Sequence, residues 1–87
     1  MPDPLDPRRK RLIYRSQHTG MKETDLLLGP FARAHVPGFT NEQLECYERL
    51  LGQPDPDIFD WASGRAPVPE AHDTGVMQLL KNFHSTT

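Results

Sequence analysis

Apolar residues recur at intervals of three and four along most of this chain, which is the spacing that places side chains on one face of an α-helix. The clearest case follows Thr40, where one face would carry Leu44, Tyr47, Leu50 and Leu51. No stretch alternates apolar and polar residues for long enough to predict a β-strand. The pattern therefore predicts an all-α fold, a single small bundle of about five short helices.

Capping residues set the expected limits of the first two helices. Asp6 followed by proline predicts a helix over residues 7–18, whose sparse core contacts would come from Leu12, Ile13 and the ring of Tyr14. A second helix should begin near Gly20. Its apolar residues are Met21, Leu27, Leu28 and Phe31. The Gly29-Pro30 pair predicts a kink or break, with helix resuming through Ala34.

The remaining helices have equally local signals. Thr40 and Gln43 form a capping-box pattern, with Phe39 and Leu44 at the hydrophobic-staple positions, and Gly52 ends the third helix. Asp55-Pro56 repeats the cap-and-proline start for a short fourth helix that is closed by Gly64. We expect Phe59 and Trp61 to fill the core from this helix. A fifth helix would use the apolar positions between residues 76 and 83.

A length of 87 residues allows one small domain. We expect a single helical domain over residues 1–87, with flexible tails at 1–6 and 85–87. Such a chain is too small for a deep active-site cavity of its own. Cys46 is the only cysteine, so this chain alone forms neither a disulfide nor a cysteine-based zinc site.

Targeting signals are not evident in the sequence. No apolar run approaches the roughly 20 residues of a membrane span, so no membrane insertion is expected. Residues 1–7 are acidic and rich in proline, unlike a signal or transit peptide. We therefore predict a soluble cytoplasmic protein of a bacterium.

Charge is distributed unevenly although the formal net charge is only −2. Half of the ten lysines and arginines lie between Arg8 and Arg15. The middle of the chain is acidic through Glu42, Glu45, Glu48, Asp55, Asp57 and Asp60. The basic cluster is interpreted as a solvated helix face or a surface for docking on protein, and nucleic acid is not expected because aromatic interleaving and zinc-finger spacing are absent.

The basic cluster gives way to an apolar stretch at residues 15–25, with Gly20 between them. Glycine readily adopts left-handed backbone, so this segment predicts a tight joint between two helices. Lys22 and Glu23 would lie in the first turn of the second helix and point outwards. The candidate partner-binding residues are Arg15, His18, Thr19, Gly20, Met21, Lys22, Glu23 and Asp25. The alternative is an ordinary helix start that needs a glycine and favours an acid.

No residue pattern typical of catalysis or metal binding is found. The histidines lack a second His or Cys at metal-ligand spacing; they are His18, His35, His72 and His84. Glu42, Glu45 and Glu48 are interpreted as a solvent-exposed helix face. Cys46 is interpreted as a buried residue that fills space beside the core. No phosphate loop or Ser/His/Asp arrangement occurs. We therefore predict neither catalytic nor metal-binding residues.

Two segments resemble a known family. Residues 18–31, the first motif segment, resemble the Arg-Gly-x-x-Glu motif, with its following Asp and Pro-Phe, of the small FAD assembly factors of succinate dehydrogenase. Residues 54–61, the second motif segment, resemble that family's Asp-Pro-Asp-Leu-Phe-x-Trp run. The resemblance extends over about residues 8–83. Thr19 stands where the family has its motif arginine, so only Gly20 and Glu23 carry over as matched motif residues.

The resemblance implies an all-α protein that binds the flavoprotein subunit of succinate dehydrogenase and promotes covalent attachment of FAD to a histidine of that partner. It implies a non-catalytic monomer that binds no cofactor stably itself and acts on the FAD of the partner. Fumarate reductase is a possible second client. Two alternatives remain open: a nucleic-acid-binding regulator that uses the basic first helix, and an antitoxin-like partner of a membrane toxin.

Overall fold

Helices account for all the regular structure in the described part of the chain, residues 6–86 of a computed structural model. They are α1 (Pro7–Gln17), α2 (Lys22–His35), the 3₁₀ helix η1 (Val36–Gly38), α3 (Asn41–Leu51), α4 (Asp55–Ser63), the 3₁₀ helix η2 (Glu70–His72) and α5 (Gly75–Thr86). The prediction of an all-α fold with five short α-helices is confirmed. Of the tails predicted at residues 1–6 and 85–87, residues 1–5 and 87 lie outside the described residues, whereas Asp6 caps α1 and residues 85 and 86 belong to α5.

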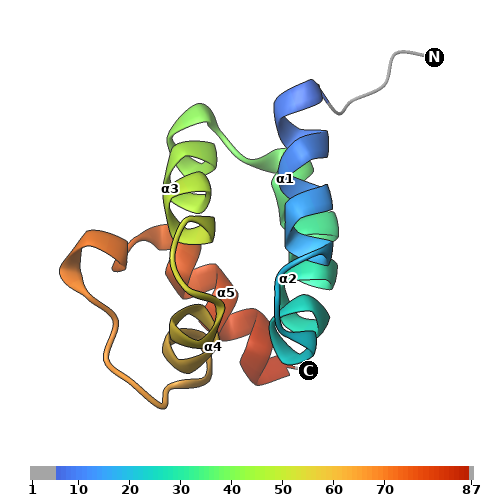
Figure 1. Cartoon of the computed structure of the whole chain (residues 1–87). Coiled ribbons are helices and arrows are strands. Elements are labelled where there is room, and N and C mark those ends of the chain that lie inside the picture. The colour runs from blue at the N-terminus through green and yellow to red at the C-terminus, as the bar shows by residue number, and fades with distance from the viewer. Residues whose placement is uncertain (1–5, 87) are drawn as a thin grey trace.

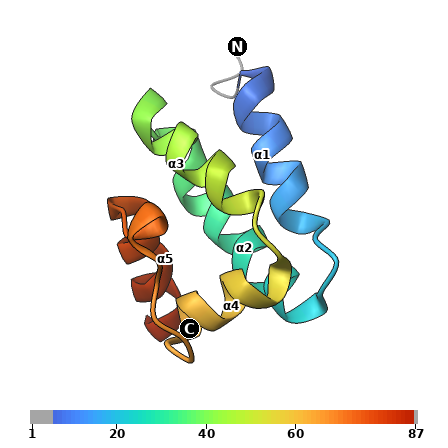
Figure 2. The ribbon, with the colours of Figure 1, turned by 60° about the vertical axis from the view of Figure 1, so that its left-hand side comes forward.

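The helices form two groups around one core (Figure 1). α1 and α2 lie side by side and α3 packs opposite them, whereas α4 and α5 close one end of the bundle (Figures 1 and 2). The connection between α4 and α5 projects from the body of the molecule (Figure 1). The turn between α1 and α2 therefore lies near the start of α4, because the chain returns to that end after α3 (Figure 2).

The core draws on every α-helix. Its largest fully buried side chains include Tyr47, Phe31, Leu12, Leu28, Leu44, Ile58, Met77 and Leu80. Trp61 is buried as expected, while Phe59 is half-buried against the core. Tyr14 is 63% exposed, so the expectation that its ring meets the core is wrong. The ring lies on the outer side of α1, away from the face that buries Leu12.

Pro30 does not break the second helix. α2 continues from Lys22 to His35 with Pro30 inside it, so the predicted break is wrong. Proline costs a helix one backbone hydrogen bond. Packing outweighs that loss here, because Leu28 before the proline and Phe31 and Ala32 after it are fully buried and fix the helical path on both sides.

The predicted caps at the start of α3 and at the end of α4 are confirmed, whereas the prediction of Asp55 as the cap at the start of α4 is wrong. Thr40 accepts the Gln43 backbone N–H at 3.2 Å, and the Gln43 side chain accepts the Thr40 N–H at 2.8 Å. Gly64 closes α4 in the left-handed region at φ 84°. The cap residue of α4 is Pro54, and Asp55 is already in its first turn. The Asp55 side chain is directed to another partner, described below.

Two arginines of the basic cluster are engaged within the fold, which corrects the interpretation of a purely solvated face. Arg8 forms an ion pair with Glu48 of α3, with its Nε 3.1 Å from Oε1. Arg9 pairs with Asp6 at 2.7 Å and donates to the carbonyl oxygens of Val36, at 3.3 Å, and Phe39. Glu48 therefore pairs with α1, and its assignment to a solvent-exposed face with Glu42 and Glu45 is wrong.

These contacts also shift the pKa values of the groups that form them. The hydrogen bond from Arg8 holds the pKa of Glu48 below its usual range, and the same pair raises the pKa of Arg8. The hydrogen bond from the Arg9 backbone N–H lowers the pKa of Asp6. Both carboxyl groups therefore favour the ionised form that their partners require.

Candidate partner-binding corner

The corner, residues 18–25, joins α1 to α2. α1 ends with His18, whose backbone N–H donates to the Arg15 carbonyl at 3.2 Å. The His18 ring lies against Tyr14, with 4.2 Å between the ring centroids. α2 begins at Lys22 after Met21, whose backbone is extended and which provides no side-chain cap. The corner must therefore obtain its hydrogen bonds from other side chains.

Asp25 supplies one set of those bonds. Its Oδ1 accepts the backbone N–H of Thr19 at 2.6 Å and also lies within hydrogen-bond range of the Thr19 hydroxyl. The same hydroxyl lies 3.1 Å from the Met21 carbonyl oxygen. Thr19, which replaces the family's arginine, is thus part of the internal structure of the turn. A threonine at this position rigidifies the corner but presents no positive charge to a partner.

Asp55 supplies a second set from the start of α4. Its Oδ2 accepts the backbone N–H of Gly20, and its carbonyl oxygen lies 3.4 Å from Oγ1 of the buried Thr24. Gly20 does not adopt left-handed backbone, so the expected reason for a glycine here is wrong; among the described glycines only Gly64 has positive φ. Close approach is the reason, since a Cβ on Gly20 would lie 3.0 Å from Asp55 Oδ2.

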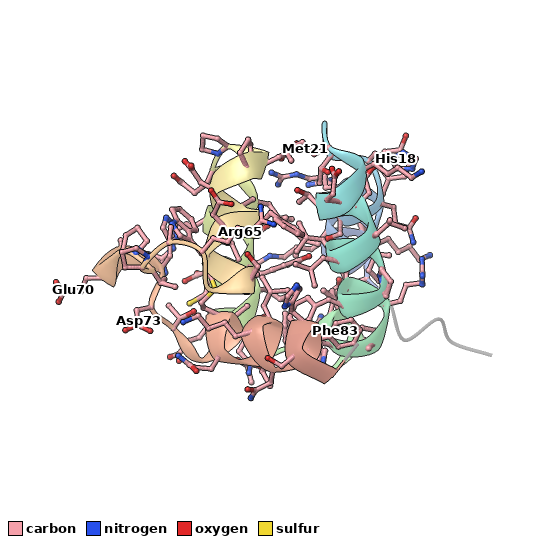
Figure 3. The ribbon with its side chains drawn as sticks, turned by 90° about the horizontal axis from the view of Figure 1, so that it is seen from below. His18, Met21, Arg65, Glu70, Asp73 and Phe83 are labelled. Carbon is pink, nitrogen blue, oxygen red and sulfur yellow. The ribbon has the colours of Figure 1, made fainter. Side chains whose placement is uncertain are left out.

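Two charged side chains extend from this scaffold into solvent. Lys22 and Glu23 are exposed, and within residues 6–86 neither forms an ion pair or side-chain hydrogen bond. His18 and Met21 lie at the same end of the molecule, remote from Phe83 (Figure 3). The corner can therefore offer one ammonium and one carboxylate group to a partner without first breaking internal contacts.

The sequence-predicted residues divide into two groups. His18, Lys22, Glu23 and Arg15 are exposed, with Arg15 in the last turn of α1. The others shape the turn: Thr19 and Asp25 bond to each other, Gly20 bonds to Asp55, and Met21 is half-buried. Partner binding by these eight residues remains a prediction.

Sequence reasoning missed three residues around the corner. Asp55 was assigned to a helix cap, although its place in the second motif segment was a signal that it has a further role. Tyr14 and Leu26 are 63% and 66% exposed, which is unusual for large apolar side chains. Their positions on the outer sides of α1 and α2 depend on the rotation of each helix in the bundle, and apolar spacing alone did not indicate it.

We find no pocket and no group of three or more His, Cys, Asp or Glu residues placed to hold a metal ion within residues 6–86. None of the helices described there has the length and apolar character needed to cross a membrane.

The chain is a small all-α bundle with a charged, outward-facing corner, and comparison with known sequences assigns it to a family. Residues 10–84 match the family described as the flavinator of succinate dehydrogenase. The chain belongs to this family, and the resemblance seen in the two motif segments is confirmed.

Individual relatives agree with this assignment. The chain is 46% identical over 78 residues to succinate dehydrogenase assembly factor 2, mitochondrial, of Dictyostelium discoideum, covering 90% of this chain and 55% of that protein. It is 43% identical over 81 residues to assembly factor 2-A of Drosophila yakuba and to 2-B of Drosophila melanogaster, covering 91% of this chain and 50% and 52% of those proteins. The chain spans about half the length of these curated relatives.

The relatives correct the expected location. All three are named mitochondrial proteins, so the prediction of a cytoplasmic protein, which relied on the composition of residues 1–7, is contradicted. The accompanying expectation of a bacterial source has no support from these relatives, which are eukaryotic.

Proposed function

We propose that this protein binds the flavoprotein subunit of succinate dehydrogenase and promotes covalent attachment of FAD to that subunit. Family membership over residues 10–84 is the observation that carries the proposal, because the family is described as the flavinator of this enzyme. The relatives named as succinate dehydrogenase assembly factors support the same function. Fumarate reductase is the second client to test.

The corner is the part of the surface that we propose to contact the flavoprotein. Lys22 and Glu23 are exposed and form no ion pair or side-chain hydrogen bond with the described residues 6–86, whereas the backbone beneath them is held by Asp25 and Asp55. A rigid, charged turn of this kind loses little conformational entropy on binding. Glu23 would accept a hydrogen bond from a histidine or arginine of the partner, and Lys22 would face an acidic group.

We further propose that the protein is not an enzyme and holds no FAD of its own. The flavin supplies the electrophilic chemistry of the attachment reaction, and a histidine of the flavoprotein supplies the bond to it. The contribution of this chain would be to stabilise the partner geometry in which those two groups face each other. One copy, acting as a monomer, suffices for that contribution.

A reconstitution with purified components tests this function. The flavoprotein subunit is incubated with FAD, with and without this chain, and covalent FAD is measured as flavin fluorescence that survives denaturation and electrophoresis. We expect this chain to increase the initial rate. Glu23→Ala should lower the rate about tenfold at limiting concentration, as expected for loss of roughly one charge-assisted hydrogen bond across the interface.

Glu42→Ala is the matched control, because Glu42 is also an exposed glutamate in the first turn of a helix. It should retain the wild-type rate. An equal rate with and without the wild-type chain, for both the succinate dehydrogenase and the fumarate reductase subunits, would refute the proposed function. Equal effects of the two alanine variants would refute the specific role of Glu23.

A further inference from the structure

One side chain at the start of α4 connects that helix to the corner, and it lies outside the first motif segment. We propose that Asp55 is a positioning residue: it holds the corner backbone in the shape that presents Lys22 and Glu23 to the flavoprotein. This inference rests on the proposed function for its partner, and on the contacts of the free chain for its geometry.

Asp55 contacts the corner at two places. The carboxylate Oδ2 accepts the Gly20 N–H, and the carbonyl oxygen lies 3.4 Å from the hydroxyl oxygen of Thr24. Thr24 is completely buried in the first turn of α2, so the second contact fixes α4 relative to the start of that helix. Gly20 lies just before α2 and is exposed. The bond to Asp55 therefore ties this exposed turn to α4, in addition to the bonds by which Asp25 ties Thr19 to α2.

The same contact explains why residue 20 is a glycine. Its backbone is not left-handed, and an added Cβ would lie 3.0 Å from Asp55 Oδ2, closer than side chains normally approach. A residue with a side chain at position 20 must displace the carboxylate or shift the turn. Gly20 and Asp55 consequently act as a pair, and substitutions at the two positions should not have additive effects.

The pair also links the two motif segments, which are separated by more than twenty residues in the sequence. Gly20 belongs to residues 18–31 and Asp55 to residues 54–61. Asp55 and Asp57 both place a carboxylate in the first turn of α4, where it interacts favourably with the helix dipole. Of these two residues only Asp55 bonds to the corner. Asp57 is therefore a control that has the favourable interaction with the helix dipole but not the hydrogen bond to Gly20.

The test compares Asp55→Ala, Asp55→Asn and Asp57→Ala by two measurements. The first is hydrogen exchange of the Gly20 amide in the free chain, followed by NMR. The second is the concentration of the chain that gives half-maximal stimulation of flavin attachment, together with the maximal rate. Asp55→Ala should accelerate Gly20 exchange at least tenfold and raise the half-maximal concentration about tenfold, without changing the maximal rate.

Asp55→Asn should restore most of both properties because its side-chain oxygen can accept the same N–H. Asp57→Ala should behave as wild type in both. Unchanged Gly20 exchange in Asp55→Ala, or an equal rise in the half-maximal concentration with Asp57→Ala, would overturn the proposal. An inactive wild-type chain would instead indicate failure of the proposed function, and the exchange measurement would still report on the Gly20–Asp55 contact.

A second variant covers the case in which Asp55→Ala does not fold. Gly20→Ala keeps Asp55 and should itself raise the half-maximal concentration, since its new Cβ presses on the carboxylate. When combined with Asp55→Ala, which removes the carboxylate that the new Cβ would meet, it should add less than its effect in the wild-type background. Additive effects in a folded double variant would contradict the coupling.

Discussion

Ser16 is a polar residue on the core-facing side of α1, and its surroundings determine the direction of a buried hydrogen-bond chain. Its hydroxyl oxygen lies 2.7 Å from the Leu12 carbonyl oxygen and also contacts the Tyr47 hydroxyl. A serine has one hydroxyl hydrogen, which the carbonyl oxygen requires. Tyr47 must therefore donate to Ser16. Burial raises the pKa of Tyr47, which keeps the phenol protonated for this role.

This direction of the hydrogen bond predicts that Ser16→Ala and Tyr47→Phe lower the free energy of unfolding by different amounts. Ser16→Ala leaves the buried Tyr47 hydroxyl without its acceptor and should lower the free energy of unfolding by about 1–3 kcal/mol. Tyr47→Phe leaves Ser16 bonded to Leu12 and should cost about 1 kcal/mol. Urea denaturation of both variants checks the order. The double variant should be more stable than Ser16→Ala alone, and the reverse order of the single variants would contradict the assigned direction.

Some residue environments were predictable from the sequence and others were not. Leu44 and Leu50 follow directly from helical spacing and are buried. Tyr14 and Ser16 have the opposite environments from those that their polarity suggests. The reason is that α1 has few apolar residues, so its rotation is set by neighbours such as Tyr47 and not by its own pattern.

At the scale of the element, the start of α3 shows how much a local sequence can determine. Thr40 and Gln43 satisfy each other's backbone N–H groups, as the spacing of the two residues predicted. Such a reciprocal cap needs no tertiary contact, although buried Phe39 and Leu44 lie beside it.

Removal of this cap has a predictable cost. Thr40→Ala should lower the free energy of unfolding by about 1 kcal/mol, because the Gln43 N–H loses its acceptor. Thermal and urea denaturation measure the loss. Asn41→Ala changes the adjacent exposed residue, which contributes no capping bond, and should remain close to wild type. A cost equal to that of Thr40→Ala would mean that the cap is not responsible.

The continuity of α2 through Pro30 could not be predicted from the local sequence. Gly29-Pro30 is a strong breaking signal, yet helix continues through it. Gly29 itself is buried, and the site of its missing Cβ is 3.5 Å from the Gln17 Cγ atom of α1. A Cβ there would make only an ordinary van der Waals contact, so the approach of α1 and α2 does not require this glycine. Burial of Leu28, Phe31 and Ala32 maintains the helix that the Gly-Pro pair would interrupt in isolation.

At the scale of the whole molecule, the Arg8–Glu48 pair connects the beginning of α1 to α3. The pKa of Glu48 is lowered by its hydrogen bond from Arg8, so the pair contributes stability when Glu48 is ionised. That contribution is present above the pKa of an unfolded glutamate and is lost as the pH falls through the lower, folded-state pKa. Both side chains are 35% exposed, which limits the contribution.

Glu48→Gln should therefore be slightly less stable than wild type at pH 7, and the difference should shrink as the pH falls below about 4. Urea denaturation at a series of pH values measures it. Glu42→Gln, at an exposed position of the same helix, is the control and should show no comparable difference at pH 7. A Glu48→Gln deficit that stayed constant from pH 7 to 3 would exclude the ion pair as its cause.

The candidate site was predictable in part. The sequence indicated a helix joint with Lys22 and Glu23 in the first turn of the second helix, and the structure places them there. It did not indicate that Asp55 bonds to Gly20, because that contact depends on how the chain returns to the corner after α3. Local signals describe the helices, whereas contacts between distant segments require their packing.

One aromatic stack gives the molecule a built-in optical probe. Trp61 is the chain's single tryptophan, is 8% exposed, and stacks on His72 with 5.4 Å between the ring centroids. His72 belongs to η2, in the projecting connection between α4 and α5 of which Figure 3 labels Glu70 and Asp73. The indole emission of the unlabelled chain therefore originates from one place, where α4 meets that connection. A change in its wavelength or intensity reports directly on whether the connection remains docked on α4.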